Sequence, residues 1–135
     1  MTPATVAELA RLIRVARGDE PADLTLRGGR VLNVYTGELV RADVAICGSW
    51  IAGVGEYAEG RTTMDLAGAI ILPGFIDGHF HIESTMLSPA SLARALAPHG
   101  TTTIVADPHE IANVAGVAGV RYMLQARGGP VEILL

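Results

Sequence analysis

Two histidines separated by a single residue form the clearest chemical pattern in this sequence. Asp77, His79 and His81 follow the apolar stretch 70–76. Because side chains alternate along a strand, these three residues are expected to point to the same side. Two neutral imidazoles placed in this way can reach one divalent cation at about 2.0–2.1 Å. An ordinary hydrogen-bonded pair is the alternative, but burying such a group is costly unless something binds it. The pattern therefore predicts a metal site with His79 and His81 as ligands.

A second group of ionisable residues lies about thirty residues further on. Asp107, His109 and Glu110 follow the β-branched, apolar run Thr101–Ala106. If this run is a strand parallel to the first, both groups lie at the carboxyl edge of one sheet. We interpret the three residues as contacts for a substrate or for an additional metal. Capping of the following helix by Asp107, with Glu110 near the helix N-terminus, is the structural alternative.

Two other titratable residues flank these groups. Glu83 comes shortly after the histidine pair. If the strand extends that far, its carboxylate faces the metal and is a candidate general acid or base. A loop carboxylate fits the sequence equally well. His99 precedes the second strand, at the opposite end of the sheet, and is interpreted as structural.

The elements that would position these residues alternate between strand and helix. Ser88 and Pro89 form a helix start, with the serine as N-cap and the proline in the first turn. The order β-α-β-α-β implies parallel strands joined by right-handed crossovers. A complete (β/α)₈ barrel needs about 250 residues, so residues 73–135 are expected to be only the start of a TIM-like barrel. The expected elements are strand 75–81, helix 89–97, strand 101–106, helix 110–127 and strand 131–135.

The first 72 residues have a different character. Thr5 and Glu8 form a capping box that predicts a helix over residues 5–17. Residues 23–72 contain short alternating runs separated by glycine-containing turns, which favours a small all-β sandwich. The sequence thus predicts an α/β protein with a small all-β part. Its two domains are residues 1–72, with a structural role, and residues 73–135.

Composition restricts the partners and the compartment. The 135 residues carry a net charge of −4 without blocks of like charge, which argues against nucleic acid as a partner. No stretch reaches the roughly 18 apolar residues of a membrane span. Arg11 and Arg14 interrupt the segment that a signal peptide would need to be apolar. The single cysteine, Cys47, is expected to be a buried structural thiol and fits a reducing compartment. These features predict a cytoplasmic protein.

Several segments resemble a known family. Residues 73–81 resemble the signature of the metal-dependent amidohydrolase superfamily. Residues 82–86, 98–103 and 106–113 are similar to adenine deaminases within it, and residues 23–55 resemble the β segment at the amino terminus of that family. The resemblance implies hydrolytic deamination of adenine to hypoxanthine and ammonia in purine salvage, with a small purine as substrate.

The resemblance also implies the chemistry of the site. It suggests a binuclear centre, with manganese favoured over iron or zinc, and His79 and His81 as ligands from the first barrel strand. A divalent metal lowers the pKa of bound water from about 15.7 toward about 7, so that hydroxide can attack C6 of the purine. Glu83 is the candidate for protonating the ring, and Asp77, Asp107, His109 and Glu110 would contact substrate or support the ligands.

The remaining ligands and the acid/base aspartate of this family come from later strands. We therefore expect an N-terminal fragment that is inactive on its own. Three alternatives stay open: another cyclic amidohydrolase similar to dihydroorotase or hydantoinase, a non-catalytic fragment that needs a partner chain, and a homo-oligomer.

Overall fold

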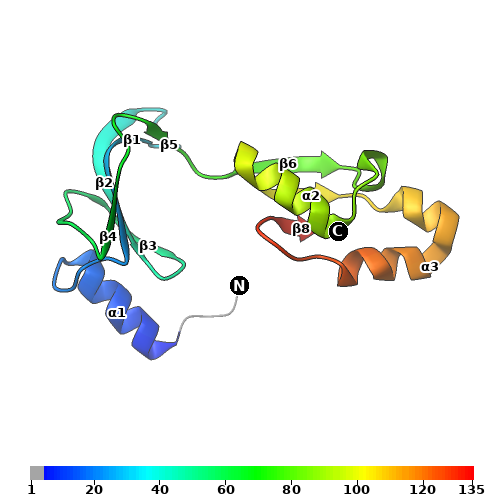
Figure 1. The fold of residues 1–135 in the computed structure, drawn as a ribbon, viewed down its shortest axis with the longest axis horizontal. Helices are drawn as coiled ribbons and strands as arrows, with labels where there is room; N and C mark the ends of the chain where they lie inside the picture. The colour runs from blue at the N-terminus through cyan, green and yellow to red at the C-terminus, as the bar shows by residue number, and fades with distance from the viewer. Residues whose placement is uncertain (1–4) are drawn as a thin grey trace. The chain divides into compact units, whose positions relative to one another are not determined.

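The computed structural model describes residues 5–135. The chain divides into two compact units, Met1–Leu72 and Pro73–Leu135, which are described separately (Figure 1). Within the part of the chain that the structure describes, no helix is both long and apolar enough to cross a membrane.

Helix α1, Val6–Ala16, begins the first unit as the capping box predicted. The Thr5 hydroxyl accepts a hydrogen bond from the backbone N–H of Glu8 at 3.3 Å, and the Glu8 carboxylate accepts one from the N–H of Thr5 at 2.7 Å. Val15 is the buried residue of the helix and packs with Ala45 and Cys47. Cys47 is therefore the buried thiol that the sequence predicted.

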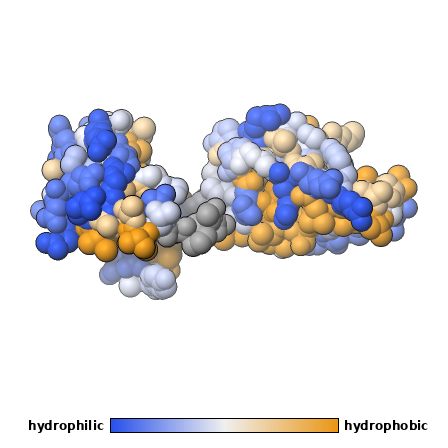
Figure 2. Space-filling model, turned by 90° about the horizontal axis from the view of Figure 1, so that it is seen from below, coloured by the Kyte–Doolittle hydropathy of each residue, from blue (hydrophilic) through white to orange (hydrophobic). Residues whose placement is uncertain are grey.

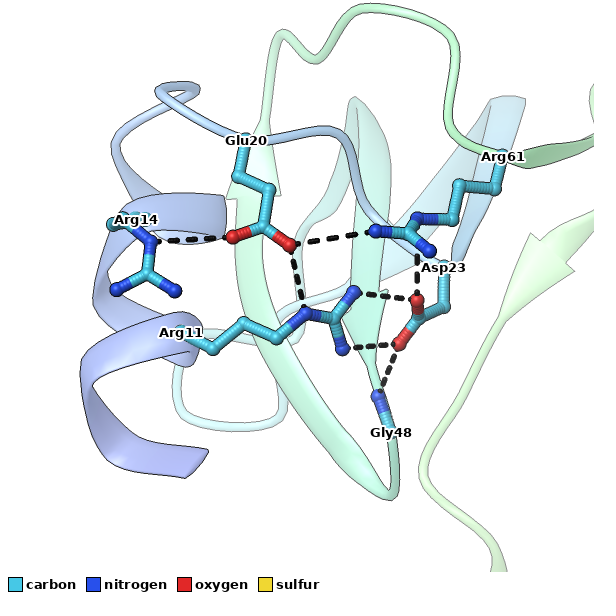
Figure 3. Close-up of polar contacts among 6 residues, drawn as sticks. All are labelled: Arg11, Arg14, Glu20, Asp23, Gly48 and Arg61. Carbon is cyan, nitrogen blue, oxygen red and sulfur yellow. Dashed lines mark hydrogen bonds and ion pairs between the residues drawn. The ribbon is translucent and has the colours of Figure 1, made fainter. Parts of the chain in front are cut away.

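A network of charged side chains attaches this helix to the sheet (Figure 3). The Arg11 guanidinium donates to both carboxylate oxygens of Asp23, at 2.8 and 2.6 Å, and to Glu20 at 2.8 Å. Asp23 also accepts from the N–H of Gly48 at 2.8 Å. The bidentate geometry fixes the helix in orientation as well as in position.

The β part of this unit is one mixed sheet, so the prediction of a sandwich was wrong. Two runs that glycines seemed to separate form a single strand, β1, with a register shift between Leu26 and Gly29. Gly28 has a φ of +66°, which glycine adopts without strain, so the pair acts as a bulge and not as a turn. The sheet order is β3-β2-β1-β4, with β5 also paired to β1. Its strands are β1 Leu24–Leu32, β2 Leu39–Cys47, β3 Trp50–Gly55, β4 Thr62–Asp65 and β5 Ile70–Ile71.

The second unit has the predicted β-α-β-α-β order. Its three strands are parallel and lie in the order β6-β7-β8, as an open sheet and not a closed barrel. Its elements are β6 Phe75–Phe80, the 3₁₀ turn η1 Glu83–Thr85, α2 Pro89–Leu96, the 3₁₀ turn η2 Ala97–His99, β7 Thr101–Ala106, α3 His109–Gln125 and β8 Glu132–Leu134.

The core of this unit lies on one face of the sheet. Ile104 and Ile133 are paired in register and buried, together with Leu92 from α2 and Met123 from α3. Val105, on the alternate position of the same strand, is exposed. Only one face of β7 is therefore buried. Figure 2 shows hydrophobic surface on this unit.

Helix α3 was expected to be continuous and is not. At Gly116 the backbone has φ 56° and ψ −147°, which separates two helical segments. Further along, a Cβ on Gly119 would lie 2.8 Å from the carbonyl oxygen of Ile111, so the segments approach closely. Two glycines in an otherwise helical pattern were the sequence signal for this bend.

Candidate metal centre

The two predicted ligands meet at the end of β6. The Nε2 atoms of His79 and His81 are 3.0 Å apart, with ring centroids at 4.7 Å and planes at 88°. The Nδ1 atom of His81 lies 3.3 Å from the backbone carbonyl oxygen of Asp107. Since a carbonyl only accepts, neutral His81 carries its proton on Nδ1, which leaves the Nε2 lone pair toward His79.

This geometry fits a shared metal ion. Two ligand atoms bound to one tetrahedral ion at about 2.0–2.1 Å lie about 3.3–3.4 Å apart. The 3.0 Å between the Nε2 atoms of His79 and His81 is close to that separation. A carbonyl contact on the far nitrogen of a histidine ligand is also typical of metal sites. The donor chemistry and spacing of the pair therefore suit a divalent cation.

The second predicted group lies at the same edge of the sheet. His109 and His81 have ring centroids 4.8 Å apart, with an angle of 75° between the planes. Ligand atoms of His81, His109 and Glu110 all lie within 4.8 Å of one another. Because β6 and β7 are parallel, their carboxyl ends bring the two groups together.

The Asp107 carboxylate contacts both the ring and the backbone of His109. Its Oδ2 lies 2.8 Å from the His109 Nδ1, and its Oδ1 accepts from the His109 N–H at 3.2 Å. The hydrogen bond that the His109 ring donates to the Asp107 carboxylate raises the pKa of His109, and the same bond lowers the pKa of Asp107. The capping alternative is thus partly realised, since Asp107 accepts from the first turn of α3 although Pro108 occupies the N-cap position.

The sequence suggested that Glu83 could extend the face of the first strand, but the structure places it in the loop after that strand. Strand β6 ends at Phe80, and Glu83 begins η1. Its Oε1 accepts a hydrogen bond from the N–H of Ile111 at 3.0 Å, and the neighbouring Ser84 donates to Glu110 Oε1 at 2.6 Å. Sequence reasoning missed Ser84, whose only signal was a hydroxyl beside the histidine pair.

Asp77 and His99 form no hydrogen bonds with the rings of the histidine pair. The Asp77 carboxylate accepts from the backbone N–H of His79 at 3.1 Å, and the register with β7 shifts between Asp77 and Phe80. Simple alternation therefore does not extend over residues 77–81. His99 is exposed in η2, before β7, whereas His109 follows that strand.

Comparison with known proteins relates these residues to one family. Residues 70–133 match the Amidohydrolase family. Adenine deaminase 2 of Carboxydothermus hydrogenoformans is 59% identical over 125 residues, which are 92% of this chain and 22% of that protein. Adenine deaminase of Kosmotoga olearia is 52% identical over 118 residues, or 87% of this chain and 20% of that protein.

Two solved structures also match part of this chain. N-acyl-D-glutamate deacylase from Bordetella bronchiseptica, complexed with zinc and a phosphonate inhibitor, matches with a TM-score of 0.55 and 31% identity, over 64% of this chain and 19% of that one. A D-aminoacylase structure matches with a TM-score of 0.53 and 33% identity, over 64% and 18% of the two chains.

The similarity concerns only a small part of each relative. The chain spans only about a fifth of the length of the adenine deaminases, at 22% and 20%. The range that matches the family model, residues 70–133, contains both histidines and the Asp107–Glu110 segment. Residues 70–133 therefore carry the match to the Amidohydrolase family, and the relatives that align with most of this chain are adenine deaminases.

Proposed function

We propose that this chain supplies the first metal ligands of a hydrolase that converts adenine to hypoxanthine and ammonia. The observation that carries the proposal is the 3.0 Å contact between the Nε2 atoms of His79 and His81 at the carboxyl end of a parallel strand. The adenine deaminases to which the chain is similar supply the substrate class, and purine salvage would be the setting.

The proposal gives the residues at this edge distinct roles around such a metal. His79 and His81 would hold a divalent ion, with manganese as our first candidate and iron or zinc as alternatives, since imidazole suits several first-row metals. When bound, the ion would lower the pKa of its bound water, so that hydroxide is available at neutral pH to attack the purine. His109 and Glu110, at the same edge, would contact a second ion or the purine.

The remaining residues orient these groups. The Asp107 carbonyl oxygen fixes the ring of His81, and the Asp107 carboxylate fixes the ring of His109. One residue thus holds an imidazole from each of the two strand ends, which supports a common site built from both.

A chimeric enzyme tests the proposal. The matching segment of the Carboxydothermus hydrogenoformans protein is replaced by this chain, and ammonia release from adenine is assayed with added Mn²⁺. We expect the chimera to be active and His79→Asn or His81→Asn to reduce kcat/KM by at least about 100-fold, more than loss of an outer contact of a metal ligand usually costs. His99→Asn is the matched control, and its activity should stay within about twofold.

Two results would contradict the proposal. One is a folded, metal-loaded chimera without adenine turnover, and the other is full activity in both histidine variants. For the 135-residue chain by itself we expect no ammonia release, because two imidazoles alone would bind a metal weakly. Robust turnover by this chain would refute that expectation.

A further inference from the structure

One N–H group in the first turn of α3 obtains its hydrogen-bond partner from a distant part of the chain. The first four N–H groups of a helix have no partner within it, and a side chain at the N-cap usually accepts from one of them. Pro108 occupies that position and offers no side-chain acceptor. The N–H of Ile111, the third helical residue, instead donates to Glu83, 28 residues earlier in the chain. Glu83 therefore caps α3 from a different loop.

The loop that carries Glu83 is itself held firmly. Ile82 is 1% exposed and belongs to the core of the second unit. The hydroxyl of Thr85 donates to the Ile82 carbonyl oxygen at 2.6 Å, and the N–H of Met86 donates to the carbonyl oxygen of Glu83 at 2.9 Å. The carboxylate of Glu83 thus projects from a short turn that is anchored in the core.

A second contact lies directly beside the first. Ser84 donates to the Glu110 carboxylate at 2.6 Å, and Glu110 precedes Ile111 in α3. The two contacts join adjacent residues of η1 to adjacent residues of the helix. Together they fix both the position of the helix start and the orientation of the Glu110 carboxylate.

We infer that Glu83 and Ser84 are positioning residues that fasten the start of α3 to the loop after β6. This inference deepens the proposed function, on which its meaning for metal binding rests. His81 precedes η1 and His109 begins α3, so fastening these two segments holds the imidazoles 4.8 Å apart, centroid to centroid. In this role Glu83 acts through its acceptor oxygen.

Three variants of the full 135-residue chain separate these roles. Glu83→Gln keeps an acceptor oxygen but loses the charge, Glu83→Ala loses the acceptor, and Ser84→Ala loses the contact to Glu110. Glu132→Gln is the matched control, since Glu132 is an exposed carboxylate on β8. The readouts are hydrogen exchange at the Ile111 amide, the nuclear Overhauser effect between the rings of His81 and His109, and Zn²⁺ affinity by calorimetry.

We expect Glu83→Ala to lower the protection of the Ile111 amide about tenfold, in line with the loss of a helix cap. The ring-to-ring signal should weaken, and Zn²⁺ affinity should fall about tenfold or more, as for other outer contacts of metal ligands. Glu83→Gln and Glu132→Gln should stay within about twofold of the wild type in all three readouts. Ser84→Ala should weaken Zn²⁺ binding while Ile111 stays protected.

The inference is overturned if Glu83→Gln loses Zn²⁺ affinity as strongly as Glu83→Ala while Ile111 stays protected, because the charge of Glu83 would then be what matters. It is also overturned if Glu83→Ala leaves both Ile111 and the ring signal unchanged. If Glu83→Ala does not fold, the glutamine and Ser84 variants decide by the same criteria. A wild-type chain that shows not even weak Zn²⁺ binding, with amide protection following the expected pattern, would refute the metal site and support the fastening.

Discussion

The Nε2 atoms of His79 and His81 lie 3.0 Å apart. Which of the two rings donates in this hydrogen bond depends on the partner of the other ring nitrogen of His81, Nδ1. Because His81 uses its Nδ1 proton toward the Asp107 carbonyl oxygen, its Nε2 accepts, and His79 must donate from Nε2. The metal-free pair is therefore asymmetric, with different tautomers on the two rings.

Metal binding should change the tautomer of His79 alone. An ion that binds both Nε2 atoms requires both lone pairs, so the proton of His79 must move to Nδ1. Long-range ¹H–¹⁵N spectra of the neutral imidazoles, recorded with and without Zn²⁺, measure this directly. We expect His79 to switch from Nε2–H to Nδ1–H and His81 to remain Nδ1–H. His79 already in the Nδ1–H form before Zn²⁺ is added would contradict the assignment.

Removing the carboxylate of Asp107 should lower the pKa of His109. The hydrogen bond to the Asp107 carboxylate is the main cause of the raised pKa, with smaller contributions from Glu110 and Glu83. A raised pKa in the folded state stabilises the protein fully below the unfolded value of about 6.5, and this contribution is lost as pH rises through the folded pKa. The unfolding free energy of the wild type should therefore fall as pH rises above about 6.5, and that of Asp107→Asn should fall less steeply.

The measurement is the titration of the His109 ring proton by NMR, in parallel with urea unfolding between about pH 6 and 8. Asp77→Asn is the control, because the Asp77 carboxylate contacts the backbone of His79 and not His109. An Asp107→Asn variant in which His109 titrates as in the wild type would show that the contact does not set its charge.

Much of the second unit could be predicted because local signals agreed with the tertiary fold. The run Thr101–Ala106 is β7 residue for residue, and Ser88 caps α2 with Pro89 in its first turn. The edge shared by His81 and His109 followed from the parallel order of the strands. These predictions used only side-chain periodicity, capping and the chirality of crossovers.

The failures lie where the partner of a residue is distant in the sequence. Nothing local indicates that the N–H of Ile111 bonds to Glu83, 28 residues away. Gly28 and Gly29 look locally like a turn because their partners are distant: Gly29 pairs with Ala42 of β2, and the Gly28 carbonyl oxygen accepts from the N–H of Gly68, forty residues later. Simple alternation also fails after Asp77, where the pairing register of β6 with β7 shifts.

The contact between Arg11 and Asp23 should make the first unit sensitive to acid. The side-chain hydrogen bond from Arg11, followed by the N–H of Gly48, holds the pKa of Asp23 well below its usual range. A lowered pKa in the folded state stabilises the protein above the unfolded value of about 3.9, and this contribution is lost as pH falls through the lower folded value. The unfolding free energy should therefore decline as pH falls below about 5.

Arg11→Met should reduce that decline, since it removes the main cause of the low pKa. Circular dichroism during urea unfolding at several pH values measures the slope. Arg17→Met is the control, because the pair Arg17–Asp19 is exposed and such pairs contribute about 1 kcal/mol or less. Equal acid slopes in the Arg11→Met variant and the wild type would show that the pair does not stabilise the fold.

Gly116 should resist a substitution that normally stabilises helices. In a regular helix, replacing an exposed glycine by alanine gains about 1 kcal/mol. At Gly116 the backbone has φ 56° and ψ −147°, near a region that essentially only glycine adopts, so Gly116→Ala should instead cost about 1–3 kcal/mol of unfolding free energy. Ala118→Gly, at an exposed position in the second helical segment, is the control and should cost about 1 kcal/mol or less. Urea unfolding measures both variants, and the sign decides. A stabilised Gly116→Ala variant would mean that α3 is continuous, and the close approach of Gly119 to the Ile111 carbonyl oxygen would then be absent as well.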